Sequence, residues 1–173
     1  MSAELERYLN DHLAGSASAI ITIRHLVETL DDSEARDFFV KLEEEVEKDR
    51  ALLEKLLTSA GMEVTTMIQV AGEVTGRVGF FKLLWEGFQP GSLGLFEGLE
   101  LLCLGIQGKR LLWVAMQEIA PWFPEWNDMD FAKLELEAIR QRDGVEAWRV
   151  EAARDTLPDI ERRAAAAERA NAV

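Results

Sequence analysis

Residues 41–62, KLEEEVEKDRALLEKLLTSAGM, have the pattern of one long amphipathic helix. Apolar side chains recur there every three or four positions, which is the spacing that places residues on one face of a helix. The stripe is interrupted by an acidic residue, Asp49, which falls between Val46 and Leu53. A helix over about 34–60, with a carboxylate on its apolar face, is the first prediction from the sequence.

The neighbouring segments repeat the same spacing between clusters of proline and polar residues. The sequence DDS at 31–33 predicts a tight turn and a helix N-cap, so the first two helices should form an antiparallel hairpin. No segment shows the alternation of a strand, and the predicted fold class is therefore all-α. The predicted helices span about 3–30, 34–60, 67–85, 93–120 and 130–157.

These helices predict a single bundle domain over 1–157, followed by a tail over 158–173 that is either helical or disordered. Four of the helices are long, and the connection over 61–91 is long enough to cross the bundle with a short helix of its own. Short turns within each pair and a long crossover between the pairs describe one of the known four-helix bundle topologies.

The composition excludes several classes of function. The chain has 32 acidic and 19 basic residues and a net charge of −13, so nucleic acid is not an expected partner. Charged residues interrupt the most apolar stretch, 93–120, and we expect a buried bundle helix there and no membrane span. A single cysteine, Cys103, and a polar N-terminal stretch without signal-peptide features favour the cytoplasm.

The predicted topology resembles that of the ferritin-like superfamily. The run at 41–62 is similar to the second helix of bacterial ferritin-like proteins, and LGIQGKRLLW at 104–113 stands where their third helix would be. The resemblance covers most of residues 5–157. It implies a four-helix bundle with a di-iron centre, held by a Glu on each of two helices and a Glu-x-x-His pair on each of the others.

The ligand motifs of that family are missing from this sequence. The only histidines, His12 and His25, both fall in the first predicted helix, and no Glu-x-x-His occurs. Gly105-x-x-Gly108 stands at the expected third-helix ligand site. We therefore expect no metal cofactor. The alternative is an iron or manganese site with an atypical set of carboxylate ligands, namely Glu45, Asp49, Glu100 and Asp143.

Asp49 needs a partner, because an unpaired carboxylate inside a bundle would be strongly destabilising. Basic residues stand on the last two long helices at positions where the resembled family often has ligands. An ion-paired interior is thus the favoured interpretation. The expected interior charge cluster consists of Glu45, Asp49, Lys109, Arg110, Arg140 and Arg142.

Glycines follow one ridge of the predicted helix 93–120. Glycine in a helix interior is less favourable than alanine by about 1 kcal/mol, so four of them suggest a gain from close packing. The partner is either the small-residue patch at 14–19 or the same ridge of a second copy in a homodimer. The helix-packing glycines are Gly94, Gly98, Gly105 and Gly108.

An aromatic loop, PWFPEW at 121–126, contains Trp122, Phe123 and Trp126. These side chains are expected to form an interaction surface, or else a lid over one end of the bundle. Neither a Ser-His-Asp nor a Cys-His arrangement can be assembled from the residues available. The sequence therefore favours a function other than catalysis.

Three functions remain open on this evidence. The first is a non-catalytic ferritin-like module with a structural or interaction role. Its partner would be a second copy of the chain, in a homodimer, or another protein. The second is a metal-binding or oxidoreductase bundle that uses the atypical carboxylates. The third is a carrier of a small apolar ligand, with a pocket between the helix at 93–120 and the crossover helix.

Overall fold

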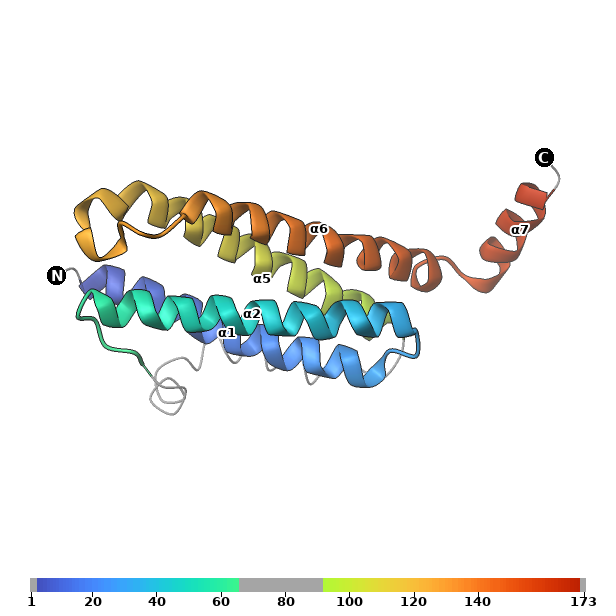
Figure 1. Ribbon diagram of the computed structural model, residues 1–173. Helices are drawn as coiled ribbons and strands as arrows, with labels where there is room; N and C mark the ends of the chain where they lie inside the picture. The colour runs from blue at the N-terminus through green and yellow to red at the C-terminus, as the bar shows by residue number, and fades with distance from the viewer. Residues whose placement is uncertain (1–2, 66–91, 172–173) are drawn as a thin grey trace.

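The computed structural model describes residues 3–65 and 92–171, and all regular structure in these two ranges is helical (Figure 1). The all-α prediction is therefore confirmed for the described residues. The predicted helix at 67–85 and most of the predicted crossover lie outside them. The described α-helices are α1 (Ala3–Thr29), α2 (Ser33–Ser59), α5 (Ser92–Ile119), α6 (Phe131–Thr156) and α7 (Ile160–Asn171).

The first two helices form the hairpin that the DDS turn predicts. The carboxylate of Asp32 caps α2 by accepting a hydrogen bond from the backbone N–H of Ala35 at 2.8 Å. At the other end, Gly61 has φ 67°, and the N–H of Met62 donates to the carbonyl of Leu57 at 3.0 Å. Glycine adopts this left-handed conformation without strain, and so α2 ends there.

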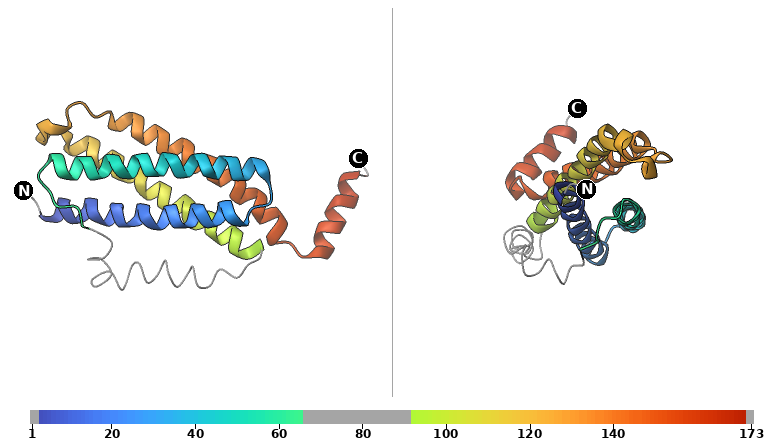
Figure 2. Two further views of the ribbon diagram at one scale, coloured as in Figure 1. Left: turned by 60° about the horizontal axis from the view of Figure 1, so that its bottom comes forward. Right: turned by 90° about the vertical axis from the view of Figure 1, so that its left-hand side faces the viewer.

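The second pair, α5 and α6, is also antiparallel, and α5 crosses the α1–α2 pair obliquely (Figure 2). Two short 3-10 turns, Ala120–Trp122 and Pro124–Trp126, connect the helices of this pair. The carboxylate of Asp130 caps α6 through the N–H of Lys133 at 2.9 Å. In both pairs the second helix therefore begins at a capping residue that can be read from the sequence.

The core lies between the two pairs and follows the predicted seams. Buried apolar side chains come from all four long helices and from the loop at 120–126. Gln141 is the one buried polar side chain among the described residues, with 3% of its surface exposed. The largest fully buried side chains include Leu9, Leu13, Ile23, Phe39, Leu42, Leu56, Leu57, Leu99, Leu112, Trp113, Met116 and Trp126.

The C-terminal segment forms a helix, α7, which extends away from the four long helices (Figure 1). Its first turn is capped by Asp159, whose carboxylate accepts from the N–H of Arg162 at 2.8 Å. Of the two states predicted for the tail, the structure has the helical one over Ile160–Asn171. No helix in the described ranges is both long and apolar enough to cross a membrane.

Three of the four helix-packing glycines do not lie at a tight contact with the described helices. A Cβ added at Gly98, Gly105 or Gly108 would meet no described atom within 4 Å. The expected close approach to the described helices is therefore not found at these three positions. At Gly94, close packing stays a prediction.

Candidate functional site: a polar network beside an apolar cavity

The centre of the bundle contains a polar network that connects three helices. Lys109 on α5 donates from Nζ to Oδ2 of Asp49 on α2 at 2.5 Å. The same ammonium group also donates to Oε1 of Gln141 on α6. The side chains of Lys109 and Asp49 are only 15% and 14% exposed, so the pair is largely removed from water. Interactions between charges strengthen under those conditions.

The network continues to the surface through Gln141. Its Nε2 donates to Oε2 of Glu45 at 3.1 Å, and the same oxygen accepts from Nη2 of Arg140 at 2.9 Å. The structure thus places Glu45, Asp49, Lys109 and Arg140 in one connected group. The cation and the anion of each pair come from different helices, so the network also fixes how the two hairpins face one another.

Two of the expected cluster residues lie elsewhere. Arg110 pairs with Glu135 on α6 at 2.6 Å. Arg142 pairs with its neighbour Asp143 at 2.7 Å and donates to Gln107 at 2.8 Å. The expectation that they belong to the interior cluster is corrected here. Successive residues on a helix differ by about 100° in direction, and Arg110 and Arg142 therefore point away from the site that Lys109 and Gln141 reach.

Gln141 belongs to the observed network but was not among the residues predicted for the interior cluster. It connects the two ion pairs, because its amide can donate to a carboxylate and accept from an ammonium group at the same time. The sequence contained a signal for it, since Gln141 falls on the apolar seam of α6 between Ala138 and Val145. A polar residue on a seam indicates a buried hydrogen-bond partner in the same way that Asp49 does.

The atypical carboxylate ligand set is not brought together. Glu100 lies 3.6 Å from Arg149, and Asp143 pairs with Arg142 and is 61% exposed. Neither is a member of the network that contains Glu45 and Asp49. Throughout residues 3–65 and 92–171, no three His, Cys, Asp or Glu side chains are grouped so that they could hold a metal ion.

The aromatic loop divides into an inner and an outer part. Trp126 is 1% exposed, and its Nε1 donates to the carbonyl of Leu56 at 3.2 Å. Phe123 stacks on Trp126 with the ring centroids 4.0 Å apart, whereas Trp122 is 75% exposed. Of the two expectations for this loop, Trp126 fits the lid, because it closes the end of the core, whereas Trp122 is the exposed member of the three aromatic residues.

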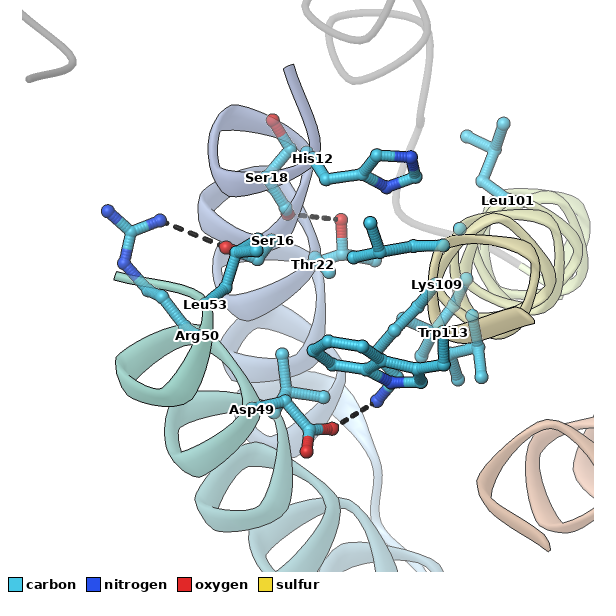
Figure 3. Close-up of a pocket in the computed structure, with 17 residues that line it drawn as sticks. His12, Ser16, Ser18, Thr22, Asp49, Arg50, Leu53, Leu101, Lys109 and Trp113 are labelled. Atoms are coloured by element: carbon cyan, nitrogen blue, oxygen red, sulfur yellow. Dashed lines mark hydrogen bonds and ion pairs between the residues drawn. The ribbon is translucent and has the colours of Figure 1, made fainter. Parts of the chain in front are cut away.

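An apolar cavity of about 110 Å³ lies beside the network, between α1, α2 and α5 (Figure 3). The pair of Asp49 and Lys109 forms part of its wall, together with the indole of Trp113. Trp113 is 1% exposed, and its Nε1 has no hydrogen-bond acceptor among the described residues. The expected pocket lay between the helix at 93–120 and the crossover helix. The described wall includes α5 but is otherwise built from α1 and α2.

The side chains of His12 and Cys103 have shifted pKa values. His12 lines the cavity, and burial lowers the pKa of its imidazole, with Asp11 acting in the opposite direction. On the other side of α5, burial and the neighbouring Glu146 carboxylate raise the pKa of the Cys103 thiol to about 12. The thiol is thus protonated at neutral pH and poorly suited to nucleophilic chemistry or metal binding.

Comparison with known proteins assigns no family to this chain. No protein-family model, no curated protein and no solved structure matches it.

Proposed function

We propose that this chain is a ferritin-like four-helix bundle that works as a non-catalytic structural or interaction module in the cytoplasm. Two antiparallel helix pairs support the bundle, and a long segment between α2 and α5 is consistent with a crossover. In this interpretation, the polar network at the centre stands where ferritin-like proteins have their di-iron site.

One observation carries this proposal: the ammonium group of Lys109 lies between the oxygens of Asp49 and Gln141. A fixed positive charge beside these oxygens repels a metal cation and already neutralises the carboxylate. Gln141 uses both ends of its amide within the network, accepting from Lys109 and donating to Glu45. Such a centre contributes to the packing of the bundle and places a cation where a metal ion would have to sit.

Metal analysis of protein purified without an affinity tag tests the proposal. We expect well under one iron or manganese per chain, and no faster oxidation of added ferrous iron than in buffer. A stoichiometric metal that is lost in Glu45→Ala would contradict it, and would favour the metal-binding or oxidoreductase alternative.

The interaction part of the proposal is supported by the exposed indole of Trp122. Tryptophan is enriched at the centres of protein interfaces, because it buries a large apolar area. The exposed indole of Trp122 could lie at the interface of a homodimer. Sedimentation at micromolar concentration should then show a species heavier than the 19.5 kDa chain, and Trp122→Ala should return it to that mass. A 19.5 kDa species in the unmodified protein would rule the dimer out.

A second candidate function, the carrying of a small apolar ligand, is favoured by the cavity between α1, α2 and α5. Most of the residues that line it are apolar or small, as in many small-molecule sites. A neutral environment-sensitive dye such as Nile red should gain fluorescence with the folded protein and should lose it on addition of a competing apolar compound. Unchanged dye fluorescence would argue against a carrier.

A further inference from the structure

One group in the wall of the cavity, the imidazole of His12, can change its charge near neutral pH. His12 lines the cavity from α1, and its ring extends from that helix toward α5 (Figure 3). Tyr8, one turn earlier, packs edge-on against this ring with the centroids 4.8 Å apart. Among the described residues that line the cavity, His12 is therefore the one whose charge is sensitive to pH between about 5 and 8.

Most of the wall around this imidazole is hydrocarbon. Leucine, isoleucine and valine side chains come from α2 and α5, and α1 adds Gly15 and Ala19. Such surroundings hydrate an ion poorly, so burial lowers the pKa of His12 and favours its neutral form. The branched aliphatic residues that line the cavity are Val46, Leu53, Leu101, Leu102, Ile106 and Leu112.

The charged groups of the wall also disfavour a protonated imidazole. Lys109 on α5 and Arg50 on α2 bring two positive charges to the cavity. Asp49 is the one carboxylate among the described lining residues, and it is bound to Lys109. Arg50 lies 3.3 Å from Glu54, which does not line the cavity. A protonated His12 would thus add a third cation to a wall whose carboxylate is already paired.

Two neighbours on α1 also act on or beside this imidazole. Asp11 raises the pKa of His12, but burial acts in the opposite direction and has the larger effect. Burial raises the pKa of the Tyr8 hydroxyl above its ordinary 10.0, so this group stays neutral when His12 titrates. The packing of Tyr8 against the ring therefore adds no charge of its own.

A neutral apolar molecule in the cavity would make protonation of His12 still less favourable. It replaces water beside the imidazole by hydrocarbon, and transfer of an ion into such surroundings costs free energy. Coupling between two binding events is reciprocal. A molecule that lowers the pKa of His12 when it binds must therefore bind more weakly once His12 is protonated.

We propose that the cavity binds small, uncharged, apolar molecules while His12 is neutral and releases them when His12 is protonated. The inference rests on the second candidate function and adds its regulation by pH. It requires no change of fold, because the charge of one side chain in the wall sets the affinity directly.

Benzene is a suitable probe, because it has no ionisable group and any pH dependence of its binding belongs to the protein. An engineered apolar cavity of about 150 Å³ binds benzene, and the cavity of about 110 Å³ here is of the same order. Isothermal titration calorimetry at a series of pH values measures the Kd, and circular dichroism checks that the chain stays folded at each pH. NMR of the His12 ring gives the midpoint of its titration.

We expect the Kd of benzene to rise roughly tenfold at one pH unit below that midpoint, since about nine tenths of the imidazole is then protonated in the free protein. At the midpoint, binding should release about half a proton per chain, which calorimetry in two buffers of different ionisation enthalpy detects. The midpoint itself should move to lower pH when the protein is saturated with benzene.

The two histidines of the chain supply a matched pair of variants. His12→Gln keeps a polar side chain that stays neutral, so it should bind benzene with one affinity throughout the pH range. His25 is exposed on the same helix and does not line the cavity, and His25→Gln should keep the pH dependence of the unmodified protein. Proton release and the shift of the NMR midpoint are measured on the unmodified protein, and they test the coupling even if His12→Gln is unstable.

Two glycine variants locate the binding site. Gly105 lines the cavity and Gly108 does not, and a Cβ at either position meets no described atom within 4 Å. Gly105→Leu should therefore abolish benzene binding, and Gly108→Leu, three residues away on α5, should leave it unchanged. Unchanged binding in Gly105→Leu would place benzene elsewhere and overturn the inference.

The outcomes distinguish this regulation from the function on which it rests. A Kd of benzene that is equal above and below the His12 midpoint would overturn the regulation and leave the carrier function standing. A pH dependence that persists in His12→Gln would do the same, because another group would then cause it. If benzene does not bind the folded protein above the midpoint, the regulation is overturned, and the carrier function falls with it when Nile red also fails to bind.

Discussion

The ammonium group of Lys109 lies 2.5 Å from the carboxylate of Asp49, and this pair joins α5 to α2. Both side chains are largely buried, so removal of either partner leaves a charge in a poorly hydrated place. We expect Lys109→Met and Asp49→Ala each to lower the free energy of unfolding by about 3 kcal/mol. Urea denaturation followed by circular dichroism measures both.

The double variant Asp49→Leu, Lys109→Met removes both charges at once. Its loss of stability should be well below the sum of the two single losses, because neither charge is left unpaired. Lys133→Met provides the control, since Lys133 lies 3.8 Å from Glu137 on an exposed part of α6 and should change stability by less than about 1 kcal/mol. Additive single losses would show that the pair is not coupled.

Gly144 on α6 has a different environment from Gly108 on α5. A Cβ at Gly144 would come within 2.6 Å of the Phe38 ring, which itself packs against Phe39 and Trp148. We expect Gly144→Ala to destabilise the protein by about 1 kcal/mol or more, despite its better helix propensity. Gly108→Ala meets no described atom and should stabilise by up to about 1 kcal/mol.

Thermal denaturation of the two alanine variants tests this contrast. Phe38→Leu combined with Gly144→Ala should recover part of the lost stability, because the smaller side chain leaves room for the new methyl group. If Gly144→Ala were as stable as Gly108→Ala, the ring of Phe38 would have to move away without loss of packing.

The thiol of Cys103 should react slowly. Burial, together with Glu146, raises its pKa from the ordinary 9.0 to about 12, and its Sγ lies 3.6 Å from Oε2 of Glu146. At pH 8 the thiolate fraction is then lower by a factor of roughly a thousand, since each unit of pKa changes it about tenfold. We expect alkylation by iodoacetamide to be at least a hundredfold slower in the native protein than in urea.

Removal of the neighbouring carboxylate should reverse part of this effect. Glu146→Gln lowers the pKa of Cys103 and should speed alkylation, and Glu151→Gln, an exposed change on the same helix, should not. Equal rates for Glu146→Gln and the unmodified protein would mean that burial alone controls the thiol.

Burial of His12 should make stability depend on pH. The folded pKa lies below the ordinary 6.5, so below pH 6.5 the unfolded chain binds a proton more readily than the folded one. The free energy of unfolding should therefore fall as pH decreases from 6.5 toward the folded pKa, and this contribution should be constant at lower pH. In His12→Gln the decrease between pH 7 and 5 should be smaller, as urea denaturation at each pH would show.

Direct titration of the His12 ring protons by NMR gives an independent reading of the same shift. A midpoint at or above 6.5 would contradict the burial argument. With a midpoint at 6.5, His12→Gln should leave the pH dependence of stability unchanged, and with a higher midpoint it should make the loss of stability at low pH larger.

Helix positions were predictable because their signals are local. The apolar spacing in 41–62 and the capping residues Asp32 and Asp130 act within one or two turns of their own helix. Asp49 could be recognised as paired, since burial of a lone carboxylate is unfavourable in any bundle. These inferences required no knowledge of how the two hairpins cross.

The partner of each cation could not be predicted in the same way. Lys109 and Arg110 are adjacent, and the choice between Asp49 and Glu135 depends on the rotation of α5 against α2 and α6. The cavity also depends on that crossing, because it is the space that α5 leaves beside α1 and α2. Trp122 and Trp126 belong to one short loop, and only its 3-10 turns decide which of them is buried.

The polar network also predicts how a metal site could be built in this bundle. The ammonium group of Lys109 occupies a point bounded by oxygens of Asp49 and Gln141, with Glu45 bound to the same glutamine. Combining Lys109→Ala with Gln141→Glu removes the cation and creates a third carboxylate next to Glu45 and Asp49. Three carboxylates around one space suit hard cations, which prefer oxygen ligands.

Terbium luminescence measures this conversion. Trp113 lines the same cavity as Asp49 and Lys109, so its excitation should sensitise a Tb³⁺ ion held there. We expect green emission from the double variant and none from the unmodified protein, in which Lys109 repels the ion. Asp49→Asn added to the double variant should weaken binding of the ion by at least about tenfold, because one charged ligand is lost. A double variant that stays helical by circular dichroism but binds no Tb³⁺ would show that these three positions do not converge on one space.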